Sequence, residues 1–164
     1  MSNYVNILLV VTVELVHFMS KNISLEICPI ARSLSVLGDA WSMLILRDAH
    51  AGFTRFDQFR KSLGIAPTML TKRLSVLVDE GLLEKRQYSE HPPREEYVLT
   101  QAGKDFLPVL FVIGAWGRKH KPFENPEKMP IFLDAEQGTE IIPIVIDKVT
   151  GAEIGSRTIH QKAE

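Results

Sequence analysis

The feature that most constrains the fold is a pair of short amphipathic segments, 54–64 and 67–80, separated by only two residues. Gly64 can end the first segment, and Pro67 suits the first turn of the second, which Gly81 then terminates. Apolar residues recur at helical spacing in both segments. Two helices joined by so short a turn are the outline of a helix-turn-helix.

The second helix has an unusual polar face. Its apolar arc consists of Leu70, Leu74, Leu77 and Val78. The opposite face carries Thr68, Thr71, Lys72 and Ser75. No carboxylate occurs on that face before Asp79, although surface helices usually mix acids among their bases. Hydroxyl and ammonium groups can contact DNA base edges and phosphates, so this face is a candidate DNA surface; the alternative is an ordinary solvated face.

A basic hairpin is expected directly after this helix. Residues 83–89 and 95–99 are rich in strand-forming side chains, and the Pro-containing segment 90–93 lies between them. The expected hairpin carries Lys85 and Arg86 on its first strand, and Arg94 just past its tip. An arginine at that place suits the negative potential of a narrow minor groove; the alternative is a solvent-exposed loop arginine. A helix pair followed by a basic hairpin predicts a winged helix.

Two helices are expected before this region. The first covers 29–37, where Ile30, Leu34 and Leu37 are spaced for one buried face. Asp39 is a favourable N-cap for the second, which should end before residue 52.

A long apolar helix is expected over 101–120, capped by Thr100 and kinked by Pro108. It is hydrophobic most of the way round, which is typical of buried helices. We therefore expect it to form a dimer interface; burial within the same chain is the alternative. The expected interface residues are Phe106, Leu110, Ile113 and Trp116.

The ends of the chain differ from its middle. Residues 1–24 form an apolar extension with neither the basic start of a secretory signal nor the length of a membrane span. The extension is either a packed segment or lies upstream of a true start at Met19. Residues 121–164 form an acidic tail, in which the sequence over 131–154 repeats with an offset of 13 and predicts two β-hairpins. The tail either covers the dimer or binds a partner.

The predicted fold class is α+β and mainly helical: a winged helix-turn-helix over 25–120, with a C-terminal dimerisation helix and a small β-hairpin tail. The net charge of −1 hides an asymmetry. Residues 54–94 hold eight basic and five acidic residues, whereas the tail holds five basic and eight acidic ones. A basic middle is consistent with nucleic-acid binding.

Enzyme chemistry is not expected. The sequence has no phosphate-binding glycine loop and no HExxH, GxSxG or CxxC motif, and its five histidines are scattered. We therefore expect no catalytic residues, no metal and no cofactor. A single cysteine cannot form an internal disulfide, which favours the reducing cytoplasm, and no membrane partner is expected.

The sequence resembles HxlR-type winged helix-turn-helix regulators, bacterial relatives of the MarR group, from about Cys28 to His120. The matching motifs include Cys28-Pro29-Ile30, Leu37-Gly38-Asp39-Ala40-Trp41, Ile45-Leu46-Arg47-Asp48, Gly52-Phe53-Thr54-Arg55-Phe56, Gly64-Ile65-Ala66-Pro67, Leu70-Thr71-Lys72-Arg73-Leu74, Gly81-Leu82-Leu83, Pro93-Arg94-Glu95-Glu96-Tyr97 and Trp116. Ala66 departs from the family, which commonly has a capping serine there.

The resemblance implies a homodimer that binds double-stranded DNA at a roughly palindromic operator and usually represses transcription. In this interpretation Thr68, Thr71, Lys72 and Ser75 face bases. Phosphate contacts are then expected from Arg55, Lys61, Arg73, Lys85 and Arg86, with Arg94 at the wing tip. Arg73 lies at the edge of the apolar arc, so bracing of the wing is its alternative role.

Cys28 matches the position of a redox-sensing thiol in some family members, and it precedes a helix N-terminus, where the dipole favours a thiolate. The alternative is a half-buried structural cysteine. A small-molecule or oxidant effector is a further open partner, and the sequence does not identify it. Two other functions remain open: a winged-helix module that binds protein without specific DNA binding, and a thiol enzyme using Cys28.

Overall fold

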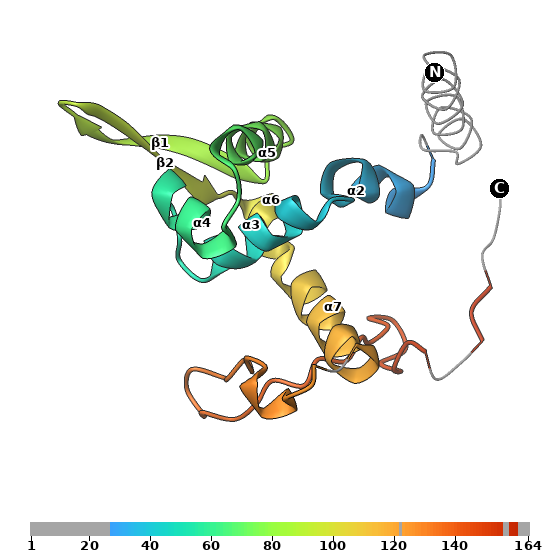
Figure 1. Cartoon of the computed structure of the whole chain (residues 1–164). Helices are drawn as coiled ribbons and strands as arrows, with labels where there is room; N and C mark the ends of the chain where they lie inside the picture. Colours follow the sequence, from blue (N-terminus) through green and yellow to red (C-terminus); the bar gives the residue numbers. More distant parts are fainter. Residues whose placement is uncertain (1–26, 122, 156–157, 161–164) are drawn as a thin grey trace, which may run out of the picture. The chain divides into compact units, whose positions relative to one another are not determined.

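The computed structural model describes residues 27–121, 123–155 and 158–160 of the chain (Figure 1). The N-terminal extension therefore lies outside the described residues. The chain divides into two compact units that meet between Lys104 and Asp105, and each is described by itself. Within the described part, no helix has the length and apolar character needed to cross a membrane.

The first unit is the winged helix. Its elements in chain order are α2 (Pro29–Leu37), α3 (Ala40–His50), α4 (Phe56–Leu63), α5 (Pro67–Asp79), β1 (Leu83–Glu90), β2 (Pro93–Leu99) and α6 (Gln101–Asp105). The expected helix-turn-helix is α4 and α5, joined at Gly64, whose φ of 61° lies in the left-handed region that favours glycine. The predicted fold class is confirmed.

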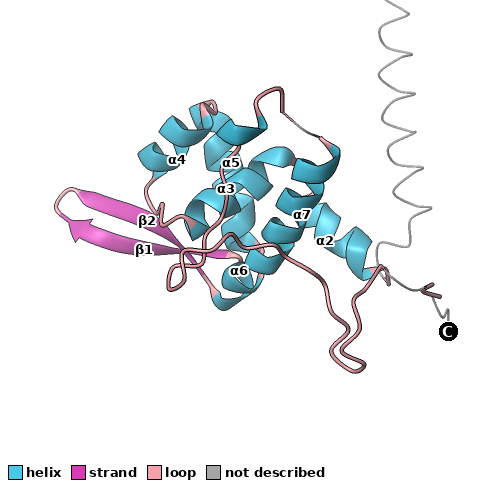
Figure 2. Cartoon of the chain, turned by 90° about the horizontal axis from the view of Figure 1, so that it is seen from below, coloured by secondary structure: helices cyan, strands magenta, loops and turns pink. Residues whose placement is uncertain are grey.

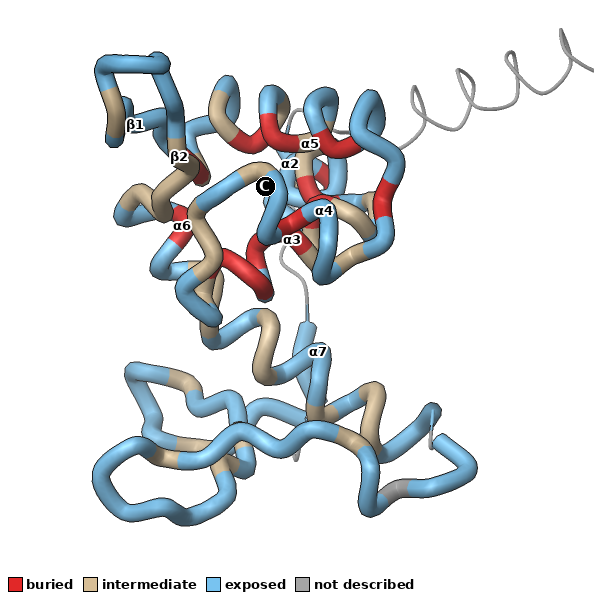
Figure 3. The backbone as a smooth tube through the Cα atoms, turned by 60° about the vertical axis from the view of Figure 1, so that its left-hand side comes forward, coloured by how far each residue is buried: buried red, intermediate tan, exposed pale blue. Residues whose placement is uncertain are grey.

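The core of this unit lies where α3, α4 and α5 meet (Figure 3). Helix α3 supplies Ile45 and Leu46, and α4 supplies Phe59, all fully buried. The apolar arc of α5 closes the core with Leu70, Leu74 and Leu77, which are also fully buried. Because these three leucines share one face, the opposite face of α5 is turned outward.

The expectation of a buried face on α2 is wrong in part. Leu37 is buried, but Ile30 is 71% exposed and Leu34 is 54% exposed. Ile27, one turn before Ile30, is exposed as well. Periodic spacing shows that a helix face is apolar, and it does not show that the same chain covers that face.

The wing is an antiparallel pair of strands that projects beyond the helices (Figure 2). Leu83 pairs with Leu99 at its base and Glu90 with Pro93 at its tip, with an irregularity between Gln87 and Ser89. The backbone N–H of Tyr97 donates to the carbonyl of Thr54, at 2.7 Å, so the wing is also tied to the segment before α4.

The expected single helix over 101–120 is wrong. The structure has two helices, α6 and α7 (Leu107–His120), separated at Phe106. Pro108 lies in the first turn of α7, where its missing N–H removes no helical hydrogen bond, so it starts a helix instead of kinking one. Thr100 does cap α6, because its hydroxyl accepts a hydrogen bond from the N–H of Gly103 at 3.2 Å.

The second unit contains α7, the short 3-10 helix η1 (Pro126–Lys128) and two turns of the same design. In the first turn Gly138 N–H donates to the Asp134 carbonyl, and in the second Gly151 N–H donates to that of Asp147, both at 2.8 Å. The repeat is therefore confirmed in the backbone. The strands are reduced to single bridges, Leu133 with Glu140 and Ile146 with Glu153.

Helix α5 begins without a side-chain cap. Ala66 holds the N-cap position with φ −62° and ψ 138°, an extended conformation that a capping serine also adopts.

We expect Ala66→Ser to raise the free energy of unfolding by about 1 kcal/mol, because the hydroxyl would accept from an unpaired N–H of the first turn of α5. Urea unfolding monitored by circular dichroism measures this difference. Ala66→Val, which adds volume without an acceptor, should show no such gain; equal stability of the serine variant and the wild type would contradict the expectation.

Candidate nucleic-acid interface

The outward face of α5 carries the four residues expected to face DNA bases. Thr68, Thr71, Lys72 and Ser75 are all exposed. The hydroxyl of Thr71 donates to the carbonyl of Pro67 at 3.0 Å, which leaves its oxygen free to accept. Lys72 makes no ion pair with any of the described residues. The face can therefore offer hydroxyl groups and one unneutralised cation to a ligand.

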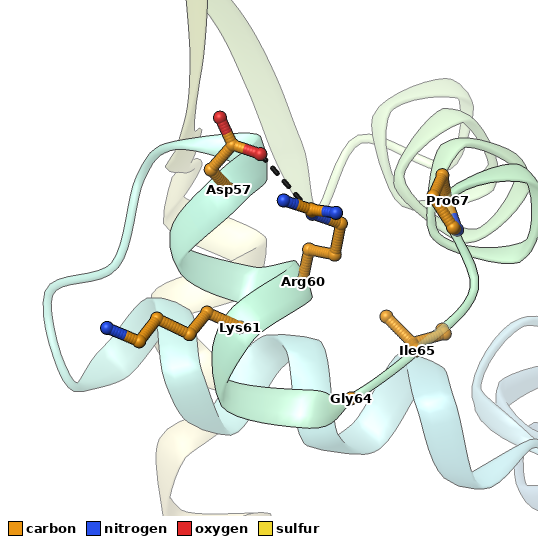
Figure 4. Close-up of a pocket in the computed structure, with 6 residues that line it drawn as sticks. All are labelled: Asp57, Arg60, Lys61, Gly64, Ile65 and Pro67. Atoms are coloured by element: carbon orange, nitrogen blue, oxygen red, sulfur yellow. Dashed lines mark ion pairs between the residues drawn. The ribbon is translucent and has the colours of Figure 1, made fainter.

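A shallow hollow of about 430 Å³ lies beside the start of α5 (Figure 4). It is lined by Asp57, Arg60, Lys61, Gly64, Ile65 and Pro67. Arg60 pairs with Asp57 across 3.4 Å, whereas the Lys61 side chain extends away from this pair. Lys61 is exposed and has no acidic partner among the described residues. Its ammonium group is therefore available for the expected contact with a phosphate.

The cations of the wing are neutralised to different extents. Lys85 Nζ lies 3.1 Å from a carboxylate oxygen of Glu95 on the facing strand, and that hydrogen bond is the main cause of its raised pKa. Arg86 pairs with Glu84 on its own strand. Arg94 is exposed near the tip and has no ion pair in the described part of the chain. Arg94 is therefore the wing cation most available to a phosphate or a minor groove.

Arg55 connects the wing to the helices. Its guanidinium carbon lies 4.8 Å from the ring centroid of Tyr88 on β1, a cation–π contact. The Arg55 side chain is exposed, so a phosphate can still reach it. Tyr88 was not among the expected site residues, and the signal that could have marked it is an aromatic side chain on a solvent-facing strand.

The ion-pair partner that the structure gives Arg73 is not on the wing, and bracing of the wing stays a prediction for Arg73. Its Nε lies 3.3 Å from a carboxylate oxygen of Asp39, the residue that caps α3. The Arg73 side chain is only 27% exposed. Its assignment to a phosphate stays a prediction, but the structure gives this guanidinium an intramolecular partner.

The Asp39 carboxylate is held in several ways. Partial burial has the largest single effect on the pKa of Asp39 and acts to raise it. Hydrogen bonds from Ser42 and Trp41 and the positive charge of Arg73 act to lower the pKa. Together they outweigh burial, so the pKa is lowered. Folding is therefore stabilised above the unfolded-state pKa of about 3.9, and this contribution is lost as the pH falls through the lower folded-state pKa.

We expect the stability difference between wild type and Asp39→Asn to be constant from neutral pH to about pH 5 and to shrink below about pH 4. Urea unfolding of both proteins over that pH series measures it. A difference that persists unchanged into acid would contradict this assignment of the carboxylate.

Against the described part of the chain, the expected dimer helix α7 has no buried residue. Phe106 and Leu110 are half-buried, whereas Ile113 is 47% exposed and Trp116 is 57% exposed. The alternative, burial within the chain with cover from the N-terminal extension, falls on residues outside the described ones. The ring of Phe111 on α7 does contact that of Phe132 in the tail, with centroids 4.7 Å apart.

Cys28 is half-buried and occupies the N-cap position of α2, with φ −82° and ψ 113°. Its side chain makes no capping hydrogen bond. Among the described residues, no group of His, Cys, Asp and Glu is arranged to hold a metal ion.

Residues 36–125 of the chain match the model of the HxlR-like helix-turn-helix family. An uncharacterized HTH-type transcriptional regulator of Mycobacterium tuberculosis is 38% identical over 131 residues, which cover 79% of this chain and 82% of that relative.

Two solved structures resemble the chain to different extents. The crystal structure of the protein PA1607 matches with a TM-score of 0.73 and 34% identity, covering 87% of this chain and 98% of that one. The redox regulator HypR in its reduced form matches with a TM-score of 0.54 and 29% identity, covering 58% of this chain and 95% of HypR. The smaller coverage by HypR shows that part of this chain is additional to what the two proteins share.

Proposed function

The chain belongs to the HxlR-like helix-turn-helix family, and from that premise we propose that it is a sequence-specific repressor that binds a palindromic operator as a homodimer. Its relatives are HTH-type transcriptional regulators, and the protein is likewise a DNA-binding transcriptional regulator and not an enzyme. We place its action in the cytoplasm, where the operator DNA is.

The observation that carries the proposal is the exposed, carboxylate-free face of α5. Thr68, Thr71, Lys72 and Ser75 are solvent-exposed while the leucines of the same helix are buried. Side chains of these types at the start of a recognition helix can bind base edges in a major groove. Lys61 on α4 and Arg94 on the wing supply unneutralised charge for phosphates or the minor groove, with Arg55, Lys85 and Arg86 as further candidates.

Exposed apolar surface supports the homodimer. Ile113 and Trp116 on α7 are exposed, and so are Ile30 and Leu34 on α2. Large exposed apolar side chains gathered on helices mark protein–protein interfaces. A two-fold dimer would present two α5 helices about 34 Å apart, the spacing of successive major grooves on one side of DNA.

Titration of the wild-type protein with the DNA that adjoins its own gene tests the proposal, with fluorescence anisotropy as the readout. We expect tight, salt-dependent binding that is stronger than binding to unrelated DNA, and weaker binding with a shallower salt dependence for Lys72→Ala and Arg94→Ala. Equal affinity of both variants and the wild type would overturn the assigned DNA surface. Absence of any specific binding would favour the protein-binding module.

The prediction that Cys28 senses oxidants is supported by its partly accessible position at the start of α2 and by the likeness to the redox regulator HypR. We expect the thiol oxidant diamide to weaken operator binding by the wild type and to leave Cys28→Ser unaffected, because this is the only cysteine. Intact-mass analysis and a non-reducing gel identify a mixed or an intersubunit disulfide. An identical response of both proteins would exclude Cys28 as the sensor.

A further inference from the structure

We propose that Arg73 and Asp39 form a positioning pair that fixes the orientation of the recognition helix α5, and that Arg73 is not a phosphate contact. The inference rests on the proposed DNA-binding function and adds to it a residue, Asp39, that has the wrong charge for DNA contact. The pair joins α5 to the N-terminal end of α3, two elements that are far apart in the sequence.

The Asp39 carboxylate is itself rigidly placed. One oxygen accepts from the backbone N–H groups of Trp41, at 3.0 Å, and Ser42, at 3.1 Å. The other accepts from the hydroxyl of Ser42 at 2.6 Å. The preceding residue is a glycine because a Cβ on Gly38 would clash with the carbonyl oxygen of Leu34. Asp39 is therefore a fixed anchor rather than a mobile surface acid.

Arg73 depends on this anchor. Its Nε is buried, forms no hydrogen bond within the described part of the chain, and lies 3.3 Å from the nearer Asp39 oxygen. The two side chains are 27% and 24% exposed, so solvent screens their attraction less than it screens an ordinary surface pair. A guanidinium placed in this way contacts α3 and is poorly available to a phosphate.

The pair restrains a motion that the apolar core restrains weakly. Leu70, Leu74 and Leu77 hold α5 against the core, but contacts between apolar side chains are non-directional. Rotation of a helix by about 20° about its axis moves a side-chain end about 6 Å from that axis by about 2 Å, which exceeds the tolerance of a hydrogen bond. A charged contact between Arg73 and a fixed carboxylate opposes such rotation and so keeps Thr71 and Lys72 aimed outward.

Two variants separate positioning from phosphate contact. Arg73→Met keeps the apolar stem and removes the charge, and Asp39→Asn keeps an acceptor for capping and removes the opposite charge. If Arg73 positions α5, each variant should weaken binding to the operator DNA about tenfold, and the double variant should be no weaker than either single one. The slope of log affinity against log salt should stay at the wild-type value.

Direct phosphate contact gives the opposite pattern. Arg73→Met would then lower the salt slope by about 0.9 for each phosphate that the side chain no longer neutralises, and Asp39→Asn would leave affinity unchanged or increase it, because it removes negative charge. Lys61→Met is the matched control, since Lys61 is an exposed candidate for phosphate and should show the lowered slope.

Different results would contradict operator binding and the positioning pair. Wild-type protein that binds no operator DNA would contradict the proposed function. Wild-type binding that Lys61→Met weakens, but that neither Asp39→Asn nor Arg73→Met weakens, would overturn only the positioning pair. Asp39→Asn decides the question if Arg73→Met does not fold, because loss of affinity at an unchanged salt slope is expected only of a positioning residue. Circular dichroism of each variant shows that it is folded.

Discussion

Replacement of both Ile113 and Trp116 by aspartate is expected to convert the proposed dimer to a monomer and to lower affinity for the operator by about 10²–10⁴-fold. The two side chains are exposed on α7, a helix with no residue buried among the described residues. Four carboxylates in a two-fold interface would have to be buried without partners, which opposes association. Each released winged helix would then bind one half-site alone and lose the gain from simultaneous engagement.

Light scattering coupled to size-exclusion chromatography measures the mass, and fluorescence anisotropy measures DNA affinity. Lys128→Asp is the control, because it also places an aspartate at an exposed position in the same unit. A doubly substituted protein that remains dimeric and binds normally would contradict the role of α7.

The reversal of charge at Lys72 is expected to weaken operator binding by about 100-fold or more. Lys72→Glu removes a cation from the outward face of α5 and places a carboxylate there, in both subunits of the proposed dimer. One good contact between a side chain and a base is worth about 1–3 kcal/mol, and repulsion from the phosphates adds to its loss. Thermal unfolding should be little changed, because Lys72 makes no ion pair in the described part of the chain.

Lys148→Glu makes the same change of charge at an exposed position in the acidic tail. The affinity of this variant for the operator should stay within about threefold of the wild type, since salt screens the effect of a charge that lies outside the DNA interface. Equal losses in the two variants would indicate a general effect of net charge and would contradict a specific role for the face of α5.

The sequence predicted the helices of the winged unit well because their ends are marked by local chemistry. Pro29 and Pro67 open helices, Asp39 caps one, and Gly64 and Gly81 follow helix ends, all as expected. These signals act within a few residues and need no tertiary information. The exposed face of α5 was predictable for the same reason, since the spacing of its leucines determines which side is outward.

The parts that were not predictable depend on contacts between distant residues. The partner of Arg73 is Asp39, and that of Arg55 is the ring of Tyr88, each more than thirty positions away. The exposure of Ile30 on α2 depends on which surfaces a single chain can cover. The break at Phe106 was not predictable, because a proline such as Pro108 is compatible both with a kink inside a helix and with the first turn of a new helix.

Recognition of DNA by the outward face of α5 is tested most directly by cleavage of operator DNA with an iron chelate attached to that face. The protein carries Thr71→Cys in a Cys28→Ser background, where serine is itself a favourable N-cap for α2. If α5 of each subunit enters a major groove, strand cleavage should occur in two clusters centred about one helical turn apart, and none should occur when the chelate is attached at Lys148→Cys instead. Cleavage that is absent from the Thr71→Cys complex, or equal for the two attachment sites, would contradict recognition of DNA by this face.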